Sequence, residues 1–505
     1  MKASLINALC MATLAAAACS SNAEVFASSK TCCNALREEG SPSNTFYPDQ
    51  PGYNASMEGF WSLQTTFDTP SCIVKPRSSQ EVATTVQLFA RLSCKFSIKG
   101  GGHTPWAGAA SISDGVTIDM TDMSDVALNA NKTVARIGAG ARFGKVYRAL
   151  EEQGMMVAAG RDANVGFGGL VLGGGFSWFT STMGLVADGL VNIELVTGDG
   201  KIINANASSN ADLFQGLKGG GNNFGVVTRY DLKAFEFSEM WGGLRIYPNT
   251  TQDQQIDAFV NFTNNLQTDT NANIINFSAY SAASGLHLNW NFMHYTKPIV
   301  DPPIYAEFDR IPGKLTDSTR IATVSNLTAE LGTSEQRARN LFLTLSFAND
   351  AAMYKSAVDI SNSYLNDFLD TPGLLWVQLF QPINTIISKA SVANGGNIMG
   401  VDRNKDNIIM YQLFLTWDND SDDEDLINAA YASIEAIKAK TVATGTDNPF
   451  IYLNYAGKFQ DPLGGYGKAN VAKLAQLSAK YDPNGVFQRL VPGGFKIANA
   501  NPTTP

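Results

Sequence analysis

The chain carries several glycine-rich stretches, each placed between apolar runs. They span residues 99–108, 160–169, 173–177 and 219–225. Glycine has no Cβ, so the backbone N–H groups of such a turn can converge on an anion such as a pyrophosphate without steric cost. Several loops of this kind in one chain indicate a single extended ligand that carries phosphate groups.

The segment that surrounds the first glycine loop reads as alternating strands and helices. Ser78 and Glu81 have the spacing of a capping box, and apolar residues follow at helical intervals up to Cys94. Phe96 and Ile98 then alternate as a strand that enters the loop, before a further strand at 116–120 and a helix that ends near Gly154. This order predicts an α/β nucleotide-binding unit.

Four motifs carry a resemblance to a known family. They are Lys-Gly-Gly-Gly-His at 99–103, Gly-Gly-Gly-Phe-Ser at 173–177, Gly-Gly-Gly-Asn-Asn-Phe-Gly-Val-Val-Thr at 219–228 and Tyr-Leu-Asn-Tyr at 452–455. In this order the chain resembles the berberine bridge enzyme-like branch of the vanillyl-alcohol oxidase and p-cresol methylhydroxylase (PCMH) superfamily, above all its fungal members. The resemblance implies an α+β fold, in which a PCMH-type FAD-binding fold of two α/β subdomains joins a substrate domain whose antiparallel sheet is backed by helices.

The resemblance and the change in patterning divide the chain into four parts. We expect a signal peptide at 1–23, an FAD-binding domain at 24–237, a substrate-binding domain at 238–446 and a closing segment at 447–505 that returns to the FAD-binding domain. In the second domain, long alternating runs at 276–295 and 407–417 predict strands of the antiparallel sheet.

His103 is the residue to which the resemblance gives a covalent role. It matches the histidine that bonds to the 8α methyl carbon of FAD, and a neutral imidazole is a competent nucleophile near neutral pH. The other histidines, His287 and His294, lie in alternating sequence and are expected to be sheet residues. The residues expected to contact FAD are Lys99, Gly100, Gly101, Gly102, His103, Thr104, Gly108, Asp162, Val165, Gly166, Gly169, Gly173, Gly174, Gly175, Asn222 and Asn454. Asn223 is also expected to lie beside the cofactor.

Two positions in the second glycine stretch distinguish this chain from relatives. Asp162 stands where many relatives carry a cysteine that forms a second bond to the flavin, so we expect no cysteinyl link and a weaker case for an oligosaccharide oxidase. Asp162 can instead cap a turn or pair with Arg161. Val165 falls where the family controls access of dioxygen, and a small valine there favours an oxidase over a dehydrogenase.

Two residues outside the glycine loops are the candidates for catalysis. Tyr455, the last residue of the Tyr-Leu-Asn-Tyr motif, matches the tyrosine that removes the substrate's hydroxyl proton in several relatives. Such a role requires an anionic phenol favoured by local charge or hydrogen bonds. Gln412 lies where the namesake enzyme has a glutamate base. Because a glutamine cannot act as a base, it is expected to hydrogen-bond the substrate.

The function implied is that of an FAD-linked oxidase. Hydride leaves an alcohol or an activated C–H centre of a small natural product for covalently bound FAD, and dioxygen then takes the electrons and leaves as hydrogen peroxide. We expect a place in fungal secondary metabolism. The alternatives are a carbohydrate or oligosaccharide oxidase, a flavoprotein that also templates a cyclisation after oxidation, and a catalytically inactive flavin-binding protein.

Composition and targeting signals bear on partners and location. The 505 residues hold 37 basic and 46 acidic side chains, and the net charge of −9 argues against nucleic-acid and anionic-membrane partners. The apolar run near the start, too short to span a bilayer, predicts secretion, and we expect a monomer acting on a small molecule and dioxygen.

Cys32 and Cys33 should each pair with either Cys72 or Cys94, in an order that the sequence leaves open. Asn-x-Ser/Thr sequons occur at Asn54, Asn131, Asn206, Asn249, Asn261, Asn276, Asn326 and Asn419.

Overall fold

A four-stranded sheet lies at the amino-terminal end of the described chain. The computed structural model describes residues 26–39, 44–331 and 338–502, and the predicted signal peptide lies outside these ranges. The strand order is β1-β2-β4-β3, and β4 runs parallel to both β2 and β3. Its strands are β1 (Thr45–Phe46), β2 (Cys72–Val74), β3 (Phe96–Lys99) and β4 (Val116–Asp119).

Helix α4 (Ser79–Leu92) connects β2 to β3, as the sequence predicts. The Ser78 hydroxyl accepts the backbone N–H of Glu81 at the start of this helix, which satisfies one of the N–H groups that a helix leaves free. The helix also contacts strands of a second sheet, so it lies between the two sheets.

The second sheet is antiparallel and has the strand order β5-β6-β10-β8-β9. Its strands are β5 (Val126–Leu128), β6 (Val134–Gly138), β8 (Leu190–Val196), β9 (Ile202–Asn206) and β10 (Val226–Lys233). Strands β8 and β9 are consecutive in the chain and pair as a hairpin. A short pair, β7 (Met155–Met156) and β11 (Phe235–Glu236), lies beside this sheet.

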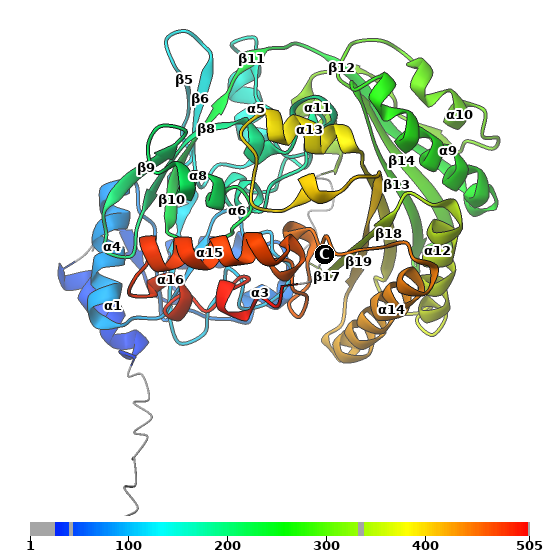
Figure 1. Cartoon of the computed structure of the whole chain (residues 1–505). Helices are drawn as coiled ribbons and strands as arrows, with labels where there is room; N and C mark the ends of the chain where they lie inside the picture. The colour runs from blue at the N-terminus through cyan, green and yellow to red at the C-terminus, as the bar shows by residue number, and fades with distance from the viewer. Residues whose placement is uncertain (1–25, 40–43, 332–337, 503–505) are drawn as a thin grey trace, which may run out of the picture.

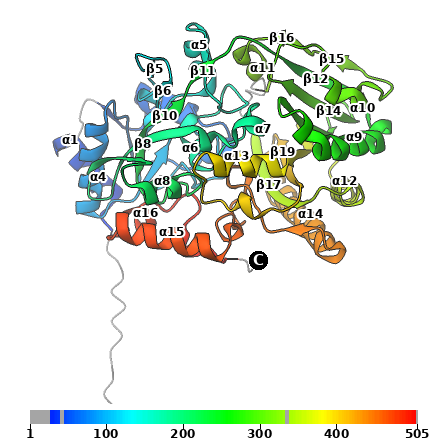
Figure 2. The ribbon, with the colours of Figure 1, turned by 45° about the horizontal axis from the view of Figure 1, so that its top comes forward.

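A nine-stranded antiparallel sheet forms the other side of the molecule (Figures 1 and 2). The order is β15-β12-β14-β13-β18-β19-β17-β20, and β16 pairs with β12. The strands are β12 (Met240–Pro248), β13 (Ala272–Ser281), β14 (Leu286–Tyr295), β15 (Thr316–Asp317), β16 (Arg320–Ala322), β17 (Arg339–Ala348), β18 (Leu375–Ile383), β19 (Ile408–Trp417) and β20 (Asp447–Asn448). The strands predicted at 276–295 and 407–417, and the placement of His287 and His294 in a sheet, are thereby confirmed.

The two faces of the nine-stranded sheet have different neighbours, because successive side chains of a strand point to opposite sides. Along β19, Tyr411 and Leu413 belong to an apolar core shared with the helices, whereas Gln412 and Phe414 line a cavity on the other face. Helices α9 (Gln252–Asn265), α12 (Ala351–Leu365) and α14 (Asp423–Thr444) cover the first face (Figure 1). The sheet therefore offers one face to a ligand, as the family resemblance implies.

The remaining α-helices lie outside these groups. They are α1 (Ser29–Glu39), α2 (Pro51–Glu58), α3 (Leu63–Thr66), α5 (Phe143–Glu151), α6 (Phe167–Leu172), α7 (Thr180–Met183), α8 (Ala211–Leu217), α10 (Ala306–Asp309), α11 (Val324–Leu331), α13 (Thr385–Ala393), α15 (Lys468–Tyr481) and α16 (Val486–Arg489).

The carboxy-terminal segment returns to the four-stranded sheet. The Leu490 carbonyl accepts the backbone N–H of Phe96, the first residue of β3. A Cβ added at Gly493 would lie 2.2 Å from the Gly108 carbonyl oxygen, so the last loop and the first glycine loop are in backbone contact. The first glycine loop and the last loop of the chain thus lie side by side, although they are far apart in the sequence.

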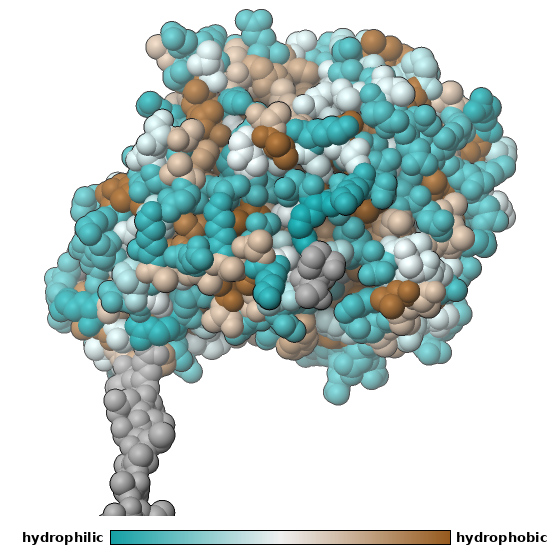
Figure 3. All heavy atoms as spheres, in the orientation of Figure 1, coloured by the Kyte–Doolittle hydropathy of each residue, from teal (hydrophilic) through white to brown (hydrophobic). Residues whose placement is uncertain are grey.

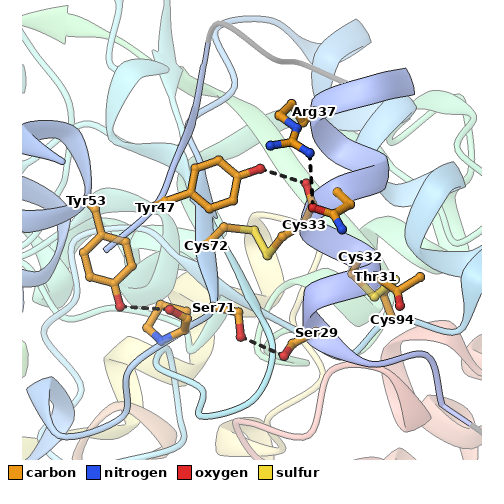
Figure 4. The surroundings of a disulfide bond; sticks show 12 residues. Ser29, Thr31, Cys32, Cys33, Arg37, Tyr47, Tyr53, Ser71, Cys72 and Cys94 are labelled. Carbon is orange, nitrogen blue, oxygen red and sulfur yellow. Dashed lines mark hydrogen bonds between the residues drawn. A yellow bond between two sulfur atoms is a disulfide. The ribbon is translucent and has the colours of Figure 1, made fainter. Parts of the chain in front are cut away.

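Two disulfides fix the amino-terminal helix, and they settle the pairing that the sequence left open. Cys32 bonds to Cys94, and Cys33 bonds to Cys72 (Figure 4). Because α1 carries both neighbouring cysteines, the bonds tie this helix to the end of α4 and to β2. The Tyr47 hydroxyl donates to the Cys33 carbonyl at the same place.

The exposure of the sequon asparagines shows which of them a glycan could reach. The face seen in Figure 3 is mostly hydrophilic, with apolar side chains scattered among polar ones. Most sequon asparagines are exposed, but Asn276 is fully buried in β13, where it donates to Asn291 and accepts from Tyr354. Asn276 is therefore not accessible to a glycan in the folded protein. Among the residues that the structure describes, no helix has both the length and the apolar character needed to cross a bilayer.

Candidate functional site

A cavity of about 380 Å³ separates the glycine loops from the nine-stranded sheet. Its floor is formed by backbone of the first two glycine loops, and its roof by side chains of β13, β17, β18 and β19. A short helical turn at Leu453–Tyr455 closes one side. Of the residues predicted to form the site, those that line the cavity are Gly100, Gly101, Gly102, His103, Thr104, Asp162, Val165, Gly166, Gly169, Asn222, Gln412, Asn454 and Tyr455.

The first two glycine loops touch each other backbone to backbone. A Cβ added at Gly101 would lie 2.3 Å from the Cα of Gly166, and one added at Gly166 would lie 2.3 Å from the backbone nitrogen of Gly101. Neither position can accept a side chain without moving the other loop. Part of the glycine pattern is therefore explained by contact between loops and not by the ligand alone.

His103 lies on the cavity wall with its ring stacked on Trp61. The ring centroids are 4.2 Å apart and the planes differ by 8°. Burial, with the positive charge of Arg142 as a second cause, lowers the pKa of His103 to about 3. The imidazole is therefore neutral at physiological pH, which leaves a nitrogen lone pair available for bond formation.

Asp162 and Val165 occupy a tight turn at the edge of the cavity. The Asp162 carboxylate accepts the backbone N–H of Asn164 at 2.8 Å, so the turn-capping interpretation is confirmed. Val165 lines the cavity, and its carbonyl accepts the backbone N–H of Phe143. This turn thus holds both side chains in the position next to the first glycine loop.

Tyr455 is held by two N–H donors from different parts of the fold. The Arg161 guanidinium donates to the phenol oxygen at 3.0 Å, and the Gln381 amide of β18 donates to the same oxygen at 3.2 Å. Arg161 and Tyr455 both line the cavity. The phenol oxygen therefore accepts two hydrogen bonds, one of them from a cationic donor.

The position of the Asn454 side chain explains why residue 173 is a glycine. Its amide donates to the Leu170 carbonyl and to the Tyr452 hydroxyl, both at 2.9 Å, and a Cβ at Gly173 would lie 2.1 Å from its side-chain oxygen. Gly174 and Gly175 have φ angles of 98° and 81°, which favour glycine. Gly173, Gly174 and Gly175 lie outside the cavity lining, and the absence of a side chain at Gly173 lets Asn454 approach. Their contact with the cofactor stays a prediction.

Lys99 and Gly108 also lie outside the cavity lining. Because strand residues alternate, Ile98 faces the cavity and Lys99 points away from it, where its ammonium lies 3.2 Å from a carboxylate oxygen of Asp119. Burial lowers the pKa of Lys99, and Asp119 opposes that shift. The Gly108 N–H donates to the Ser111 hydroxyl, so these two residues support the loop from behind.

The far end of the cavity is formed by the glycine loop at 219–225 and the carboxy-terminal segment. Asn222 donates to the Gly493 carbonyl and accepts from the Lys496 ammonium at 3.1 Å. Burial lowers the pKa of Lys496 to about 7, a shift that Asp482 opposes. Asn223, which was expected beside the cofactor, instead donates to the Gly220 and Phe495 carbonyls and ties the two segments together.

The roof of the cavity is mainly apolar. The residues that the nine-stranded sheet contributes are Ile275, Phe277, Phe342, Leu379, Gln412 and Phe414. Gln412 is the polar member of this group and is 2% exposed. It therefore supplies a single hydrogen-bonding amide on an otherwise apolar face.

Sequence reasoning missed three important parts of the site. Trp61 stacks on His103, and Gln381 donates to Tyr455, but neither lies in a recognisable motif. Arg161 was considered only as a partner for Asp162, and the structure brings it to Tyr455, which is 294 residues away in the chain. The arginine directly after Gly160, within a glycine-rich stretch, is the sequence signal that could have identified it.

These residues fit a flavin nucleotide. Backbone of Gly100–Gly102 and Gly166 borders the cavity, and a Cβ added at Gly169 would meet no atom within 4 Å, so a flat ligand can approach this surface closely. The Trp106 indole N–H, also at the cavity, is buried and has no partner in the described part of the chain. The site thus offers close backbone surfaces, a free donor and a neutral histidine.

Comparison with known proteins defines the class of protein. The FAD binding domain family matches residues 70–206, which hold the first glycine stretches. The chain is 36% identical over 479 residues to the FAD-dependent monooxygenase sdcF of Emericella nidulans, with 94% of this chain and 99% of that protein covered. It is 35% identical to the FAD-dependent monooxygenase tpcD of Cochliobolus heterostrophus, with 89% of each covered. The protein is thus an FAD-binding oxidoreductase.

Solved structures share the fold. The 6-hydroxy-D-nicotine oxidase of Arthrobacter nicotinovorans superposes with a TM-score of 0.73 at 21% identity and covers 88% of this chain and 96% of its own. The glucooligosaccharide oxidase of Acremonium strictum, described with a 6-S-cysteinyl, 8α-N1-histidyl FAD, gives a TM-score of 0.73 at 20% identity, with 95% of this chain and 100% of that chain covered. The chain belongs to the family of FAD-binding oxidoreductases that includes the fungal proteins sdcF and tpcD, and it shares the fold of these solved oxidases.

Proposed function

We propose that the protein is a secreted oxidase that oxidises an alcohol or an activated C–H centre of a small natural product in fungal secondary metabolism. The observation that carries the proposal is the Tyr455 hydroxyl, which lines the cavity and accepts N–H bonds from Arg161 and Gln381. The division at 237/238 and 446/447, the monomeric state and dioxygen as the acceptor are parts of the same proposal.

The residues have distinct tasks in this reaction. Tyr455 accepts the proton of the substrate's hydroxyl group, and Arg161 and Gln381 stabilise the phenol oxygen before that transfer. FAD, when bound, would supply the hydride acceptor, and dioxygen would be the final acceptor of the two electrons and, with two protons, would give hydrogen peroxide. His103 would hold the flavin through its 8α carbon, and no cysteinyl bond is expected because residue 162 is an aspartate.

The cavity roof supports a natural product over the alternative of a carbohydrate. Phe277, Phe342 and Phe414 present ring surfaces to the cavity, and Gln412 supplies one hydrogen-bonding group. A sugar has hydroxyl groups around its ring and loses hydrogen bonds to water on an apolar face, whereas a largely apolar substrate gains by leaving water. The oligosaccharide oxidase therefore stays the second choice.

The test is anaerobic reduction of the purified protein by a panel of alcohols, aromatic natural products and sugars, followed by readmission of air. The proposal expects loss of the oxidised flavin absorbance with an apolar alcohol, and one hydrogen peroxide for each substrate oxidised. Tyr455→Phe should bind flavin normally and reduce it at least about a hundredfold more slowly. Reduction by sugars alone would contradict the substrate class, and a normal rate in Tyr455→Phe would contradict the mechanism.

The names of the similar proteins favour a further candidate reaction, that of a monooxygenase. In that reaction one oxygen atom enters the product and the other leaves as water, with two electrons taken from the substrate or from a separate donor. Isotopically labelled dioxygen separates the two reactions. Label in the product without matching peroxide supports the monooxygenase, and turnover without oxygen consumption supports a templating role.

A further inference from the structure

Trp61 lies on a short segment that connects the first glycine loop to the roof of the cavity. Its backbone N–H donates to the Gly102 carbonyl at 3.0 Å. Two residues further on, the Leu63 N–H donates at 3.0 Å to the carbonyl of Ala338, the residue before β17. The segment that carries Trp61 is therefore fixed at one end to the loop that holds His103 and at the other to the nine-stranded sheet.

The indole of Trp61 lies flat against the imidazole of His103 and is held by roof side chains. The two ring planes differ by 8° and the centroids are 4.2 Å apart. Phe342 and Phe414 approach the same indole with tilted rings, at centroid distances of 5.3 Å and 6.1 Å. All four side chains line the cavity. Because two roof rings pack against the indole, its plane is fixed, and that plane in turn faces His103.

The stack constrains the torsion that sets the direction of the imidazole nitrogens. The torsion between the Cβ atom of a histidine and its ring is broad and has no sharp preference of its own. Rotation about it would drive an edge of the His103 ring into the face of Trp61. The parallel indole therefore keeps the ring plane of His103 in one orientation and leaves the ring edge free. A group that forms a bond reacts faster when its approach is fixed in this way.

The same segment bears on the charge of the imidazole. Burial, and then the positive charge of Arg142, lower the pKa of His103. Arg142 donates at 3.1 Å to the carbonyl of Gly59, which lies two residues before Trp61. The segment thus anchors the cation that keeps the imidazole neutral. Since a neutral imidazole already has a free lone pair, orientation is what the stack adds.

A second stack of an indole on an imidazole lies outside the cavity. Trp178 and His294 are both fully buried, with ring centroids 3.5 Å apart and planes that differ by 16°. Neither side chain belongs to the cavity lining. This pair has the same chemistry as the pair of Trp61 and His103 but no access to a cofactor, so it offers a matched control.

We propose that Trp61 is a positioning residue for the attachment of FAD, because it holds the His103 ring in the orientation from which a ring nitrogen bonds to the 8α carbon. This role of Trp61 rests on the proposed link through His103. In the attachment, a C–N bond forms while a C–H bond of the 8α methyl group and the imidazole N–H bond break. The two electrons and two protons pass to the flavin ring, and dioxygen then takes them up as hydrogen peroxide. The competing explanation is that Trp61 serves only as a wall for the substrate.

The experiment compares Trp61→Leu, which fills space without a flat face, with Trp61→Phe, which keeps a smaller flat face. Trp178→Phe is the matched control, and His103→Ala defines the signal without attachment. Each chain is produced under riboflavin limitation, loaded with FAD in air and precipitated with acid at intervals. Flavin in the pellet gives the covalent fraction and its rate of increase. Total bound flavin and the thermal unfolding midpoint are measured before precipitation.

We expect Trp61→Leu to bind a similar total amount of flavin but to attach it about three- to tenfold more slowly than the unmodified protein, which is the range for loss of one aromatic pair. Trp61→Phe should attach flavin at an intermediate rate, and Trp178→Phe at the unmodified rate. An unmodified rate in Trp61→Leu would overturn the role, and together with a raised KM it would assign Trp61 to the substrate. A rate in Trp61→Phe no higher than in Trp61→Leu would also overturn it.

Two further outcomes separate positioning from other causes. A parallel loss of covalent and total flavin in Trp61→Leu would show that Trp61 only supports the fold, and would overturn the role. If Trp61→Leu does not fold, Trp61→Met takes its place under the same criteria, since methionine fills irregular space without a flat face. An unmodified protein that never attaches flavin would overturn both this role and the link through His103. Failure to oxidise any substrate would contradict the proposed oxidase alone, because the attachment assay uses no substrate.

Discussion

The contact between the glycine loops leads to a paired prediction for Gly101→Ala and Gly169→Ala. In the first variant, the new Cβ would lie 2.3 Å from the Cα of Gly166, whose loop contributes to the same cavity. In the second, the new Cβ would meet nothing within 4 Å, and residue 169 lies within helix α6. The two changes are chemically identical and differ only in what surrounds them.

The expected magnitudes follow from these distances. An ordinary carbon contact needs about 3.5 Å, so one loop would have to move by about 1 Å, and because the obstacle is backbone we expect a loss of about 2–3 kcal/mol in the free energy of unfolding. At Gly169 an alanine should stabilise the flavin-free protein by about 0.5 kcal/mol, since alanine favours a helix over glycine. The same methyl group enters the cavity, so Gly169→Ala should lose flavin affinity.

The assay is urea unfolding of the variants in a His103→Ala background, from which flavin can be removed, with the flavin content of the proteins that keep His103 measured in parallel. We expect Gly101→Ala to unfold at lower urea, and Gly169→Ala to unfold at the same or higher urea but to carry less flavin. Equal unfolding midpoints for Gly101→Ala and the unmodified protein would refute the steric explanation. Full flavin content in Gly169→Ala would refute close approach of the cofactor to this surface.

Three further changes test other parts of the structure. Replacing Cys33 and Cys72 with serine opens a disulfide that joins residues 39 positions apart, and should cost about 3–4 kcal/mol in urea unfolding under non-reducing conditions; a change below about 1 kcal/mol would contradict this. Val165→Leu should slow reoxidation of the reduced flavin by air with little effect on its reduction, measured by stopped-flow absorbance; equal reoxidation rates would remove Val165 from oxygen control. The pKa of Lys496 is about 7 in the folded protein and about 10.4 in an unfolded chain. Between these two pH values the Lys496 side chain is protonated mainly in the unfolded state, so the free energy of unfolding rises with pH. Lys496→Met should lose that rise in urea titrations between about pH 7 and pH 10, and an unchanged slope would contradict the assignment.

The sequence predicts the parts of this site that have local signals. The glycine loops, the helix that starts after Ser78 and the alternating strands of the large sheet follow from backbone freedom, capping and periodicity. Alternation also explains why Lys99 turns away from the cavity, a detail that matching a motif alone does not provide. Local patterns therefore identify the elements more reliably than the contacts of single residues.

The rest of the site depends on contacts between distant segments. The Arg161 and Tyr455 contact joins the second glycine stretch to the carboxy-terminal segment, and Trp61 reaches His103 from a part of the chain without a motif. The contacts of Gly173 with Asn454 and of Gly174 with Met399 are likewise visible only in three dimensions. Such pairings are set by packing of the layers, which periodicity does not reveal.

The most direct test of the central claim is acid precipitation of the purified protein, followed by spectroscopy and peptide mapping of the pellet. The account predicts yellow flavin retained on the peptide that contains His103 and none on the peptide that contains Asp162, with His103→Ala releasing all flavin into the supernatant. Flavin that washes out of the unmodified protein would contradict the covalent assignment, and flavin found on any other peptide would contradict the role of His103.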